Sequence, residues 1–269
     1  YHHDDYQAFK VYDPKPRIIH KATVRDRLLH RAIYRKLYPF FDRTFIADSF
    51  SCQLGKGTHR ALNRFRAFAY QVSANHTKTC WVLKCDIKKF FASIDQTILL
   101  KILKQRISNE NILWLLEEVV KSFSTKPGIG LPLGNLTSQL LVNIHMNEFD
   151  QFVKHQLKVK HYIRYADDSV ILSPSREYLT GLLPRIGGFL KDTLKLTIHP
   201  NKVFIKTLAS GVDFLGWGHF SDHRVLRTAT KRRMFSKIRD SSNPATLVSY
   251  QGLLRWGNTE RLQSKIFSV

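Results

Sequence analysis

Two segments that lie far apart in the sequence have the alternating pattern of β-strands, and both end at carboxylates. Residues 79–86 alternate between two faces, with Val82, Lys84 and Asp86 on the same one. Residues 162–172 have the pattern of two short strands with the adjacent Asp167 and Asp168 at their turn. If these strands are neighbours in one sheet, three carboxylates meet at one edge. The pattern therefore predicts a small antiparallel sheet with a charged edge.

Helical spacing of apolar residues surrounds these strands and makes the predicted fold class α+β. Helices are predicted in 26–38 (ended by Pro39), after Ser93 or Asp95, from Ser108 to Val120, in a long amphipathic stretch over 136–157 begun at Asn135 or Thr137, and in Glu177–Leu194. Hairpins are predicted around the Asp-Pro-Lys-Pro turn of 9–20 and in VDFLGWGHF of 212–220, with a strand near Lys202.

The charge of the chain points to a polyanionic partner. Lys and Arg number 43 against 21 Asp and Glu, which leaves a formal net charge of +22 over 269 residues. A hydrophobic content of 43% is ordinary for a folded protein and excludes general disorder. The segment after Ser221 carries ten Lys or Arg and predicts a separate basic helical module. Nucleic acid is therefore the expected partner.

Two other classes of protein are excluded by the sequence. The longest stretch without charged residues, 127–147, holds glycines, a proline and many amides and hydroxyls, which a membrane-spanning helix would leave unpaired in hydrocarbon. The three cysteines, Cys52, Cys80 and Cys85, are an odd number without CxxC spacing, which argues against a disulfide framework and a zinc finger. We therefore expect a cytoplasmic protein that does not associate with membranes.

The carboxylates have an ordinary interpretation and a chemical one. An adjacent Asp pair is common in turns, where the side chains bond local backbone donors. Three carboxylates at one sheet edge, however, repel one another unless divalent cations neutralise them. Two magnesium ions about 3.5 to 4 Å apart would suit an in-line phosphoryl displacement, with the synthesis or cleavage of a polynucleotide as the expected reaction.

Five motifs in this order resemble the motifs of a reverse transcriptase, from about Phe9 to Phe267. They are CDIKKFFASID (85–95), GLPLGNLTSQ (130–139), YADD (165–168), NKVFI (201–205) and VDFLGW (212–217). The resemblance implies a right-hand polymerase fold: fingers in 1–78 and 98–137, a palm in 79–97 and 138–220, and a helical thumb in 221–269. It also implies an RNA-directed DNA polymerase that binds an RNA template, a primer and its cDNA, and dNTPs.

The same resemblance implies a role for each catalytic residue. Asp86 and Asp167 would bridge two Mg²⁺ ions, and Asp168 would complete the cluster less directly. Lys202 would protonate the leaving pyrophosphate, although a simple surface lysine is nearly as good an interpretation.

The nucleotide, the primer and the duplex are also assigned residues by this resemblance. Lys15 and Arg17, on the tip of the first hairpin, would bind the triphosphate, with Arg17 favoured because a guanidinium binds phosphate bidentately. Phe91 would exclude a ribose 2′-hydroxyl, unless it is a core residue like Phe90. The other assigned residues are Leu133 and Gly134 beside the nucleotide, Phe214, Leu215 and Gly216 in the primer grip, and Arg227, Lys231, Arg232, Arg233 and Lys237 on the duplex phosphates.

One motif separates subfamilies. Group II intron, retron and retroviral enzymes usually have Gln where this chain has Leu133 and Pro where it has Gln139. The LGNLTSQ string resembles instead the enzymes of diversity-generating retroelements. That resemblance implies error-prone copying at adenines and a small basic accessory protein that forms an oligomeric barrel. The alternatives are a group II intron-like, retron or phage-defence reverse transcriptase, an RNA-dependent RNA polymerase, and a catalytically idle nucleic-acid-binding scaffold.

Overall fold

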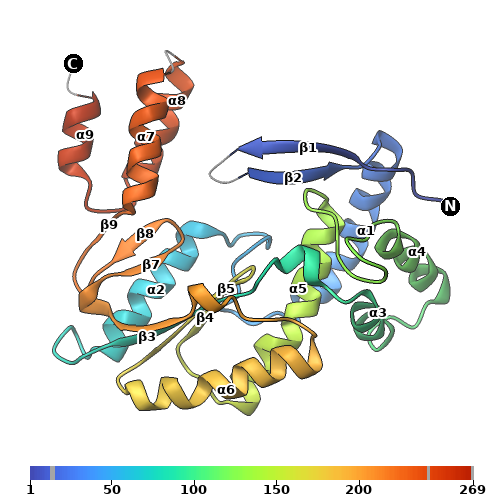
Figure 1. Cartoon of the computed structure of the whole chain (residues 1–269), viewed down its shortest axis with the longest axis horizontal. Coiled ribbons are helices and arrows are strands. Elements are labelled where there is room, and N and C mark those ends of the chain that lie inside the picture. Colours follow the sequence, from blue (N-terminus) through green and yellow to red (C-terminus); the bar gives the residue numbers. More distant parts are fainter. Residues whose placement is uncertain (13–15, 241–242, 268–269) are drawn as a thin grey trace.

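The computed structural model describes residues 1–12, 16–240 and 243–267, so Lys15, one of the predicted nucleotide-binding residues, lies outside the described residues. A four-stranded antiparallel sheet stands at the centre of the molecule, in the order β4-β5-β3-β6 (Figure 1). Its strands are β3 (Trp81–Asp86), β4 (Tyr162–Tyr165), β5 (Asp168–Ser173) and β6 (Phe204–Thr207). In the register of β3 with β5, Asp86 lies directly opposite Asp168. The predicted sheet with a charged edge is therefore present.

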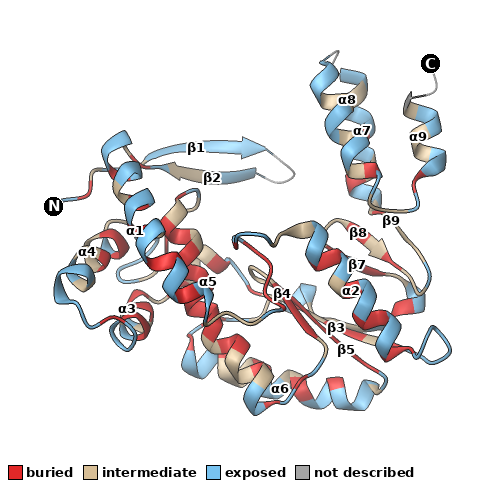
Figure 2. Ribbon diagram, turned by 180° about the vertical axis from the view of Figure 1, so that it is seen from behind, coloured by how far each residue is buried: buried red, intermediate tan, exposed pale blue. Residues whose placement is uncertain are grey.

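Both faces of this sheet are covered, and β3, β4 and β5 are mostly buried, whereas the edge strand β6 is partly exposed (Figure 2). On one face, Leu83 and Cys85 belong to a large apolar core shared with α1 (Val24–Asp42) and with four further helices. These are α3 (Gln96–Lys104), α4 (Glu110–Lys121), α5 (Leu136–Gln151) and α6 (Arg176–Thr193). On the other face, Val82 packs with α2 (Thr58–Val72) and β7 (Val212–Phe214). Because side chains alternate along β3, this strand contributes residues to the cores on both faces of the sheet.

The central helix differs from its prediction. α5 is buried on most of its surface, polar residues such as Asn143 and Asp150 included, so it is not amphipathic as the sequence analysis predicted. It is enclosed because α1, α3 and the sheet all pack around it. The helix also ends at Gln151 and continues as a π-helix, Phe152–Gln156, before β4.

The helix α1 (Val24–Asp42) runs past the proline that was predicted to end it. Pro39 lies inside the last turns of α1, where its missing N–H removes a single backbone hydrogen bond. Continuing the helix by one turn buries Phe41, which is 2% exposed, in the main core. The predicted end at Pro39 is therefore wrong, because burial of Phe41 outweighs the lost bond. The capping residues also differ: Asn109 rather than Ser108 caps α4, whereas Asp95 caps α3 as predicted.

The first hairpin extends away from the body of the protein. It consists of β1 (Gln7–Tyr12) and β2 (Pro16–Lys21), and its residues are almost all exposed (Figures 1 and 2). It is attached at its base, where the His20 amide donates to the Leu133 carbonyl at 2.9 Å and Asn135 Nδ2 donates to the His20 carbonyl at 2.9 Å. Asn135 stands at the N-cap of α5, but its side chain bonds this hairpin rather than the helix.

The C-terminal part joins the rest of the molecule through a second sheet. β7, β8 (Trp217–His219) and β9 (Arg224–Leu226) form three antiparallel strands, so the segment after Ser221 begins with a strand before its helices. The helices are α7 (Thr228–Asp240), α8 (Pro244–Leu254) and α9 (Glu260–Phe267), which stand opposite the first hairpin across a gap between ribbons (Figure 1). Short 3₁₀ turns cover Phe90–Ser93, Pro200–Lys202 and Leu208–Ser210. Within the described ranges, every helix is too short or too polar to cross a membrane.

Candidate active site

The predicted carboxylates meet at the end of the central sheet. Tyr165 pairs with Asp168, so the β4–β5 loop contains two residues, Ala166 and Asp167. Ala166 has a positive φ of 55°, which fits the first central position of a type II′ turn and leaves Asp167 at the second. The turn is held against β3, because the Ile87 amide donates to the Asp167 carbonyl at 3.3 Å. This tight turn projects Asp167 beside Asp86.

Burial and mutual repulsion raise the pKa values of two carboxylates in this cluster. Burial raises the pKa of Asp167 above its ordinary value, and the neighbouring charge of Asp86 raises it further. Burial also raises the pKa of Asp168 to about 6, against the opposing effect of Lys84. The repulsion that the sequence analysis predicted for this edge is therefore present in the structure.

Two lysines compensate part of this negative charge. Lys202 Nζ lies 2.8 Å from Asp86 Oδ1, which brings the predicted proton donor into the cluster. Lys84 Nζ lies 3.0 Å from Asp168 Oδ2. No role for Lys84 was predicted from the sequence, although the alternation of residues 79–86 places Lys84 on the same face as Asp86. A diagonal contact across the β3–β5 pair follows from that face and this register.

The donor set suits a hard divalent cation. Asp86 and Asp167 offer carboxylate oxygens, the ligands that Mg²⁺ prefers, and Asp168 Oδ1 is buried without a hydrogen-bond partner. Across the part of the chain that the structure describes, no group of three His, Cys, Asp or Glu side chains is gathered so as to hold a metal ion. Instead, the two lysine ammonium groups lie on Asp86 and Asp168, where cations would bind. The three-residue metal site therefore stays a prediction.

A buried ion pair supports the turn from below, and the sequence analysis missed it. The Arg164 guanidinium binds the Asp150 carboxylate bidentately, with Nη2 to Oδ2 at 2.7 Å, and both side chains are at most 1% exposed. Arg164 Nη1 also donates to the carbonyl of Ala166 at 3.1 Å. Tyr162 donates its hydroxyl to Asp150 at 2.7 Å. An arginine directly before YADD on a buried strand was the available signal, because a buried arginine needs an acidic partner.

The described residues predicted to bind the nucleotide lie on the first hairpin, on the turn after β3 and in the loop before α5. Arg17, on the exposed strand β2, acts to lower the pKa of Asp167, which means that its charge reaches the carboxylates from the hairpin. Phe91 is half-buried, whereas its neighbour Phe90 is only 5% exposed. The Leu131 amide donates to the Phe91 carbonyl at 2.8 Å, so this turn and the loop before α5 are joined.

Gly134 allows the hairpin to approach this loop. Its φ is +113°, and a Cβ there would lie 2.6 Å from Ile19 Cγ2 of β2. A side chain at this position would therefore strain the backbone and push β2 away. With the His20 bonds, this packing places Leu133 and Gly134 beside the strand that carries Arg17.

The predicted primer grip is a tight hairpin next to the carboxylates. Phe214 pairs with Trp217, and the two loop residues, Leu215 and Gly216, have φ of 51° and 85°, as a type I′ turn requires. Lys84 Nζ donates to the Asp213 carbonyl at 2.8 Å, which ties the hairpin to the carboxylate edge. The Arg227 amide donates to the Gly216 carbonyl at 3.1 Å. Of the other predicted duplex-binding residues, Arg232 and Lys237 are exposed on α7, and Lys231 and Arg233 are half-buried there.

This arrangement of strands, carboxylates and hairpins agrees with the family match of the sequence. Residues 10–219 match the reverse transcriptase (RNA-dependent DNA polymerase) family. The chain belongs to this family. The resemblance of its five motifs to a reverse transcriptase is thereby confirmed, and an RNA-directed DNA polymerase is confirmed at the level of the family.

Curated relatives and solved structures agree with this assignment. The chain is 26% identical to protein YkfC of Escherichia coli, over 88% of this chain and 71% of YkfC. It is 22% identical to the group II intron-encoded protein LtrA of Lactococcus lactis, over 83% of this chain but only 47% of LtrA. Telomerase of Candida albicans, solved with a fragment of telomeric RNA, superposes with a TM-score of 0.61 at 13% identity, over 84% of this chain and 46% of telomerase. The right-hand polymerase fold is therefore confirmed.

Proposed function

We propose that this chain extends a primer along an RNA template with dNTPs, by two-metal catalysis at the edge of the central sheet. The observation that carries the proposal is the juxtaposition of Asp86 and Asp168 across β3 and β5, with Asp167 in the tight turn beside them. The raised pKa values of Asp167 and Asp168 mark a site that favours bound cations over free carboxylates.

Asp86 and Asp167 would hold two Mg²⁺ ions, with Asp168 completing the site. Once bound, such ions activate the primer 3′-hydroxyl and stabilise the charge of the leaving pyrophosphate. The proton that the pyrophosphate needs would come from Lys202, whose ammonium group already lies in the cluster. Arg17 would bind the triphosphate, and we propose the same role for Lys15, which lies outside the described residues.

The remaining residues would select and hold the substrates. Phe91 would exclude a 2′-hydroxyl, and Leu133 and Gly134 would contact the nucleotide. Phe214, Leu215 and Gly216 would hold the primer end. Arg227, Lys231, Arg232, Arg233 and Lys237 would bind the duplex through its phosphates, without reading its sequence.

Within the family, we propose the error-prone enzyme of a diversity-generating retroelement, working with a small basic accessory protein. Leu133 and Gln139 in LGNLTSQ support this subfamily. A group II intron-like role is the second candidate, because LtrA, a group II intron-encoded protein, is among the relatives. Sequencing of cDNA made with a candidate accessory protein separates the two, since errors concentrated at template adenines support the retroelement and uniform low error supports the intron-like role.

Primer extension on an RNA template tests the catalytic proposal. Asp86→Ala and Asp167→Ala should each abolish extension but leave RNA affinity nearly unchanged, because metal binding and phosphate binding lie on different residues. Asp192→Ala is the matched control, since Asp192 is exposed on α6 away from the site. Substantial extension by either site variant contradicts the metal assignment. A wild-type chain that binds RNA but never extends a primer supports the idle-scaffold alternative.

A further inference from the structure

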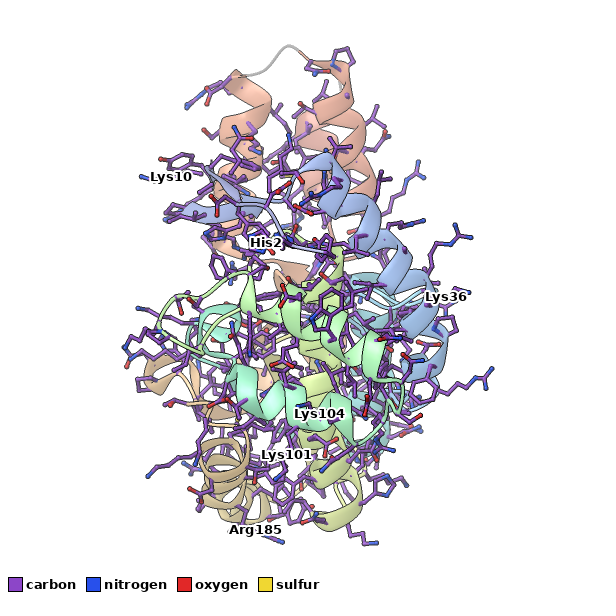
Figure 3. All side chains as sticks on the ribbon, turned by 90° about the vertical axis from the view of Figure 1, so that its right-hand side faces the viewer. His2, Lys10, Lys36, Lys101, Lys104 and Arg185 are labelled. Atoms are coloured by element: carbon purple, nitrogen blue, oxygen red, sulfur yellow. The ribbon has the colours of Figure 1, made fainter. Side chains whose placement is uncertain are left out.

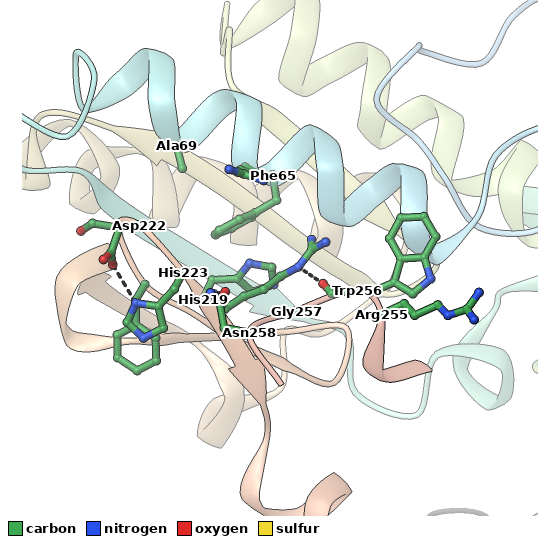
Figure 4. Close-up of a pocket in the computed structure, with 13 residues that line it drawn as sticks. Phe65, Ala69, His219, Asp222, His223, Arg255, Trp256, Gly257 and Asn258 are labelled. Carbon is green, nitrogen blue, oxygen red and sulfur yellow. Dashed lines mark hydrogen bonds and ion pairs between the residues drawn. The ribbon is translucent and has the colours of Figure 1, made fainter. Parts of the chain in front are cut away.

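We propose a second RNA contact, separate from the carboxylate edge: a pocket that binds a phosphodiester group of an RNA strand, lined by Arg66, Arg224 and Arg255. The pocket has a volume of about 290 Å³ and lies where three segments meet (Figure 4). These are the buried side of α2, the chain from His219 to Arg224 that includes the start of β9, and the α8–α9 connection at 255–258. None of its lining residues comes from β3, β4 or β5, so the pocket is separate from the carboxylate edge.

The charge of the pocket is positive and poorly compensated. Its lining contains three arginines and a single carboxylate, that of Asp222. Asp222 is 79% exposed and is paired with His223, with 2.7 Å between Oδ1 and Nδ1 (Figure 4). Among the described residues, no ion pair joins a carboxylate to any of the three arginines. The proximity of Arg66 adds to burial in lowering the pKa of Arg224. A bound anion would therefore balance the positive charge of these arginines.

Arg224 supplies the second observation that points to a ligand. Its Nε donates to the Trp256 carbonyl, and its backbone amide donates to Asn258 Oδ1 at 3.3 Å. Its Nη1, by contrast, is buried without any hydrogen-bond partner. A buried donor on a charged group is costly to leave unpaired. A phosphate oxygen would satisfy it, because guanidinium and phosphate match in bidentate geometry.

The walls of the pocket are fixed by packing. The Trp256 ring stacks on His59 of α2, with 3.8 Å between the ring centroids. A Cβ at Gly257 would overlap the Trp217 ring, so the connection lies directly against β8. The stack and this close approach fix the connection whose Trp256 carbonyl accepts from Arg224, so this arginine is positioned before a ligand arrives, which reduces the entropy lost on binding.

The chemistry of the donors selects the ligand class. Three guanidinium groups recognise phosphate without reading bases, which is how a protein holds a nucleic-acid backbone. Arg66 and Arg255 are exposed, so a strand on the surface can reach them. With a net charge of +22 on the chain, a polynucleotide is favoured over a small anion. RNA outside the primer–template duplex would then be anchored at the junction of α2 and the C-terminal helices.

The test compares Arg66→Gln, Arg255→Gln and the double variant with Arg185→Gln. Arg185 projects from the surface of α6, away from the pocket, and serves as the matched control (Figure 3). The probes are a fluorescent RNA long enough to reach from the carboxylate edge to the pocket and a short primer–template that occupies only the carboxylate edge. For the long RNA, the slope of log affinity against log salt should fall by about 1 for each pocket arginine removed. The control should keep the wild-type slope.

Extension of the short primer–template should be unchanged in the pocket variants, which separates this inference from the proposed catalytic function. Equal salt slopes for the pocket variants and the wild type overturn the inference. RNA with a 5′-phosphate and RNA with a 5′-hydroxyl should bind equally, since an internal phosphodiester is proposed. If the pocket variants differ from the wild type only with RNA that carries a 5′-phosphate, the pocket binds strand ends and the inference is overturned. The inference would also be overturned if inorganic phosphate protected the protein from thermal unfolding while the pocket variants kept the wild-type affinity for RNA. Arg66→Lys should recover part of the lost slope.

Discussion

Lys84 Nζ lies 3.0 Å from Asp168 Oδ2 and at the same time donates to the carbonyl of Asp213 at 2.8 Å. One ammonium group therefore joins a carboxylate of the candidate active site to the hairpin predicted to hold the primer end. The contact with Asp168 is largely sheltered from solvent, since the Lys84 and Asp168 side chains are 13% and 20% exposed. Lys84 therefore contributes both to the position of the hairpin and to the charge of the carboxylate edge.

Replacing this lysine should impair extension most strongly at acidic pH. Lys84 lowers the pKa of Asp168, which burial raises to about 6, so Lys84→Met should raise that pKa further. A larger fraction of Asp168 would then be protonated near neutral pH. The measurement is the single-turnover extension rate against pH at one magnesium concentration. The acidic limb should move to higher pH in Lys84→Met but not in Lys206→Met, an exposed lysine on β6. Coincident pH profiles would remove Lys84 from the site.

The buried pair of Arg164 and Asp150 should matter for rate as well as stability. Arg164→Lys keeps the charge but loses the fork of donors that reaches both Asp150 and the Ala166 carbonyl. We expect the free energy of unfolding to fall by about 1 to 3 kcal/mol. We also expect kcat for extension to fall about tenfold or more, because a small displacement of the turn misplaces Asp167. The KM for dNTP should change much less.

Arg185→Lys, on the surface of α6, is the control for this pair. Both variants are assayed well below their unfolding temperatures. If Arg164→Lys loses stability but keeps the wild-type kcat, the pair supports the fold alone.

Acid should destabilise the protein through three buried histidines. Burial lowers the pKa of His30, His145 and His219 to about 4, compared with 6.5 for an ordinary histidine. Between pH 6.5 and pH 4 the unfolded chain therefore binds more protons than the folded one. Stability is complete above pH 6.5 and is lost as the pH falls towards 4, by up to about 1.4 kcal/mol per pH unit for each histidine. Urea unfolding of His145→Leu should show a weaker loss than the wild type, whereas His155→Leu, at an exposed position, should not. Equal pH dependence in all three proteins would contradict this assignment.

Phe91 is expected to determine the choice of sugar. Its ring is half-buried at the margin of the main core, whereas Phe90 is fully within that core. Phe91→Ala should therefore admit ribonucleotides, because it opens the space that a 2′-hydroxyl requires. The measurement is the ratio of rNTP to dNTP incorporation on one RNA template, with Phe40→Ala as the control at an exposed position. An unchanged ratio with normal dNTP use would make Phe91 a core residue.

Leu133 is expected to contribute to infidelity. A Gln at this position could hydrogen-bond the nucleotide or the nearby backbone, whereas Leu offers contact without direction. Leu133→Gln should therefore lower misincorporation opposite template adenine, with some loss of overall rate from burying an amide. Sequencing of cDNA from an adenine-containing RNA measures both proteins, and Leu28→Gln, at an exposed site on α1, is the control. Equal error frequencies at adenine would exclude Leu133 as the cause.

The sequence by itself determined the strands, their carboxylate ends and the family. Alternation along β3 and the short spacing of β4 and β5 are local properties, and they predict both faces of the sheet and the turn that carries Asp167. The five motifs were recognisable for the same reason, because each keeps its chemistry within a few residues.

Only the tertiary structure decided which distant residues meet. Lys84 contacts Asp168 because of the register of β3 with β5, and Arg164 contacts Asp150 because α5 passes beneath β4. Burial of Phe41 carried α1 past Pro39 against the local propensity. The arginine pocket joins α2 to a loop about 190 residues later in the chain. Such contacts depend on packing between elements, and a single sequence records the face on which a residue lies but not the partner that the fold brings to that face.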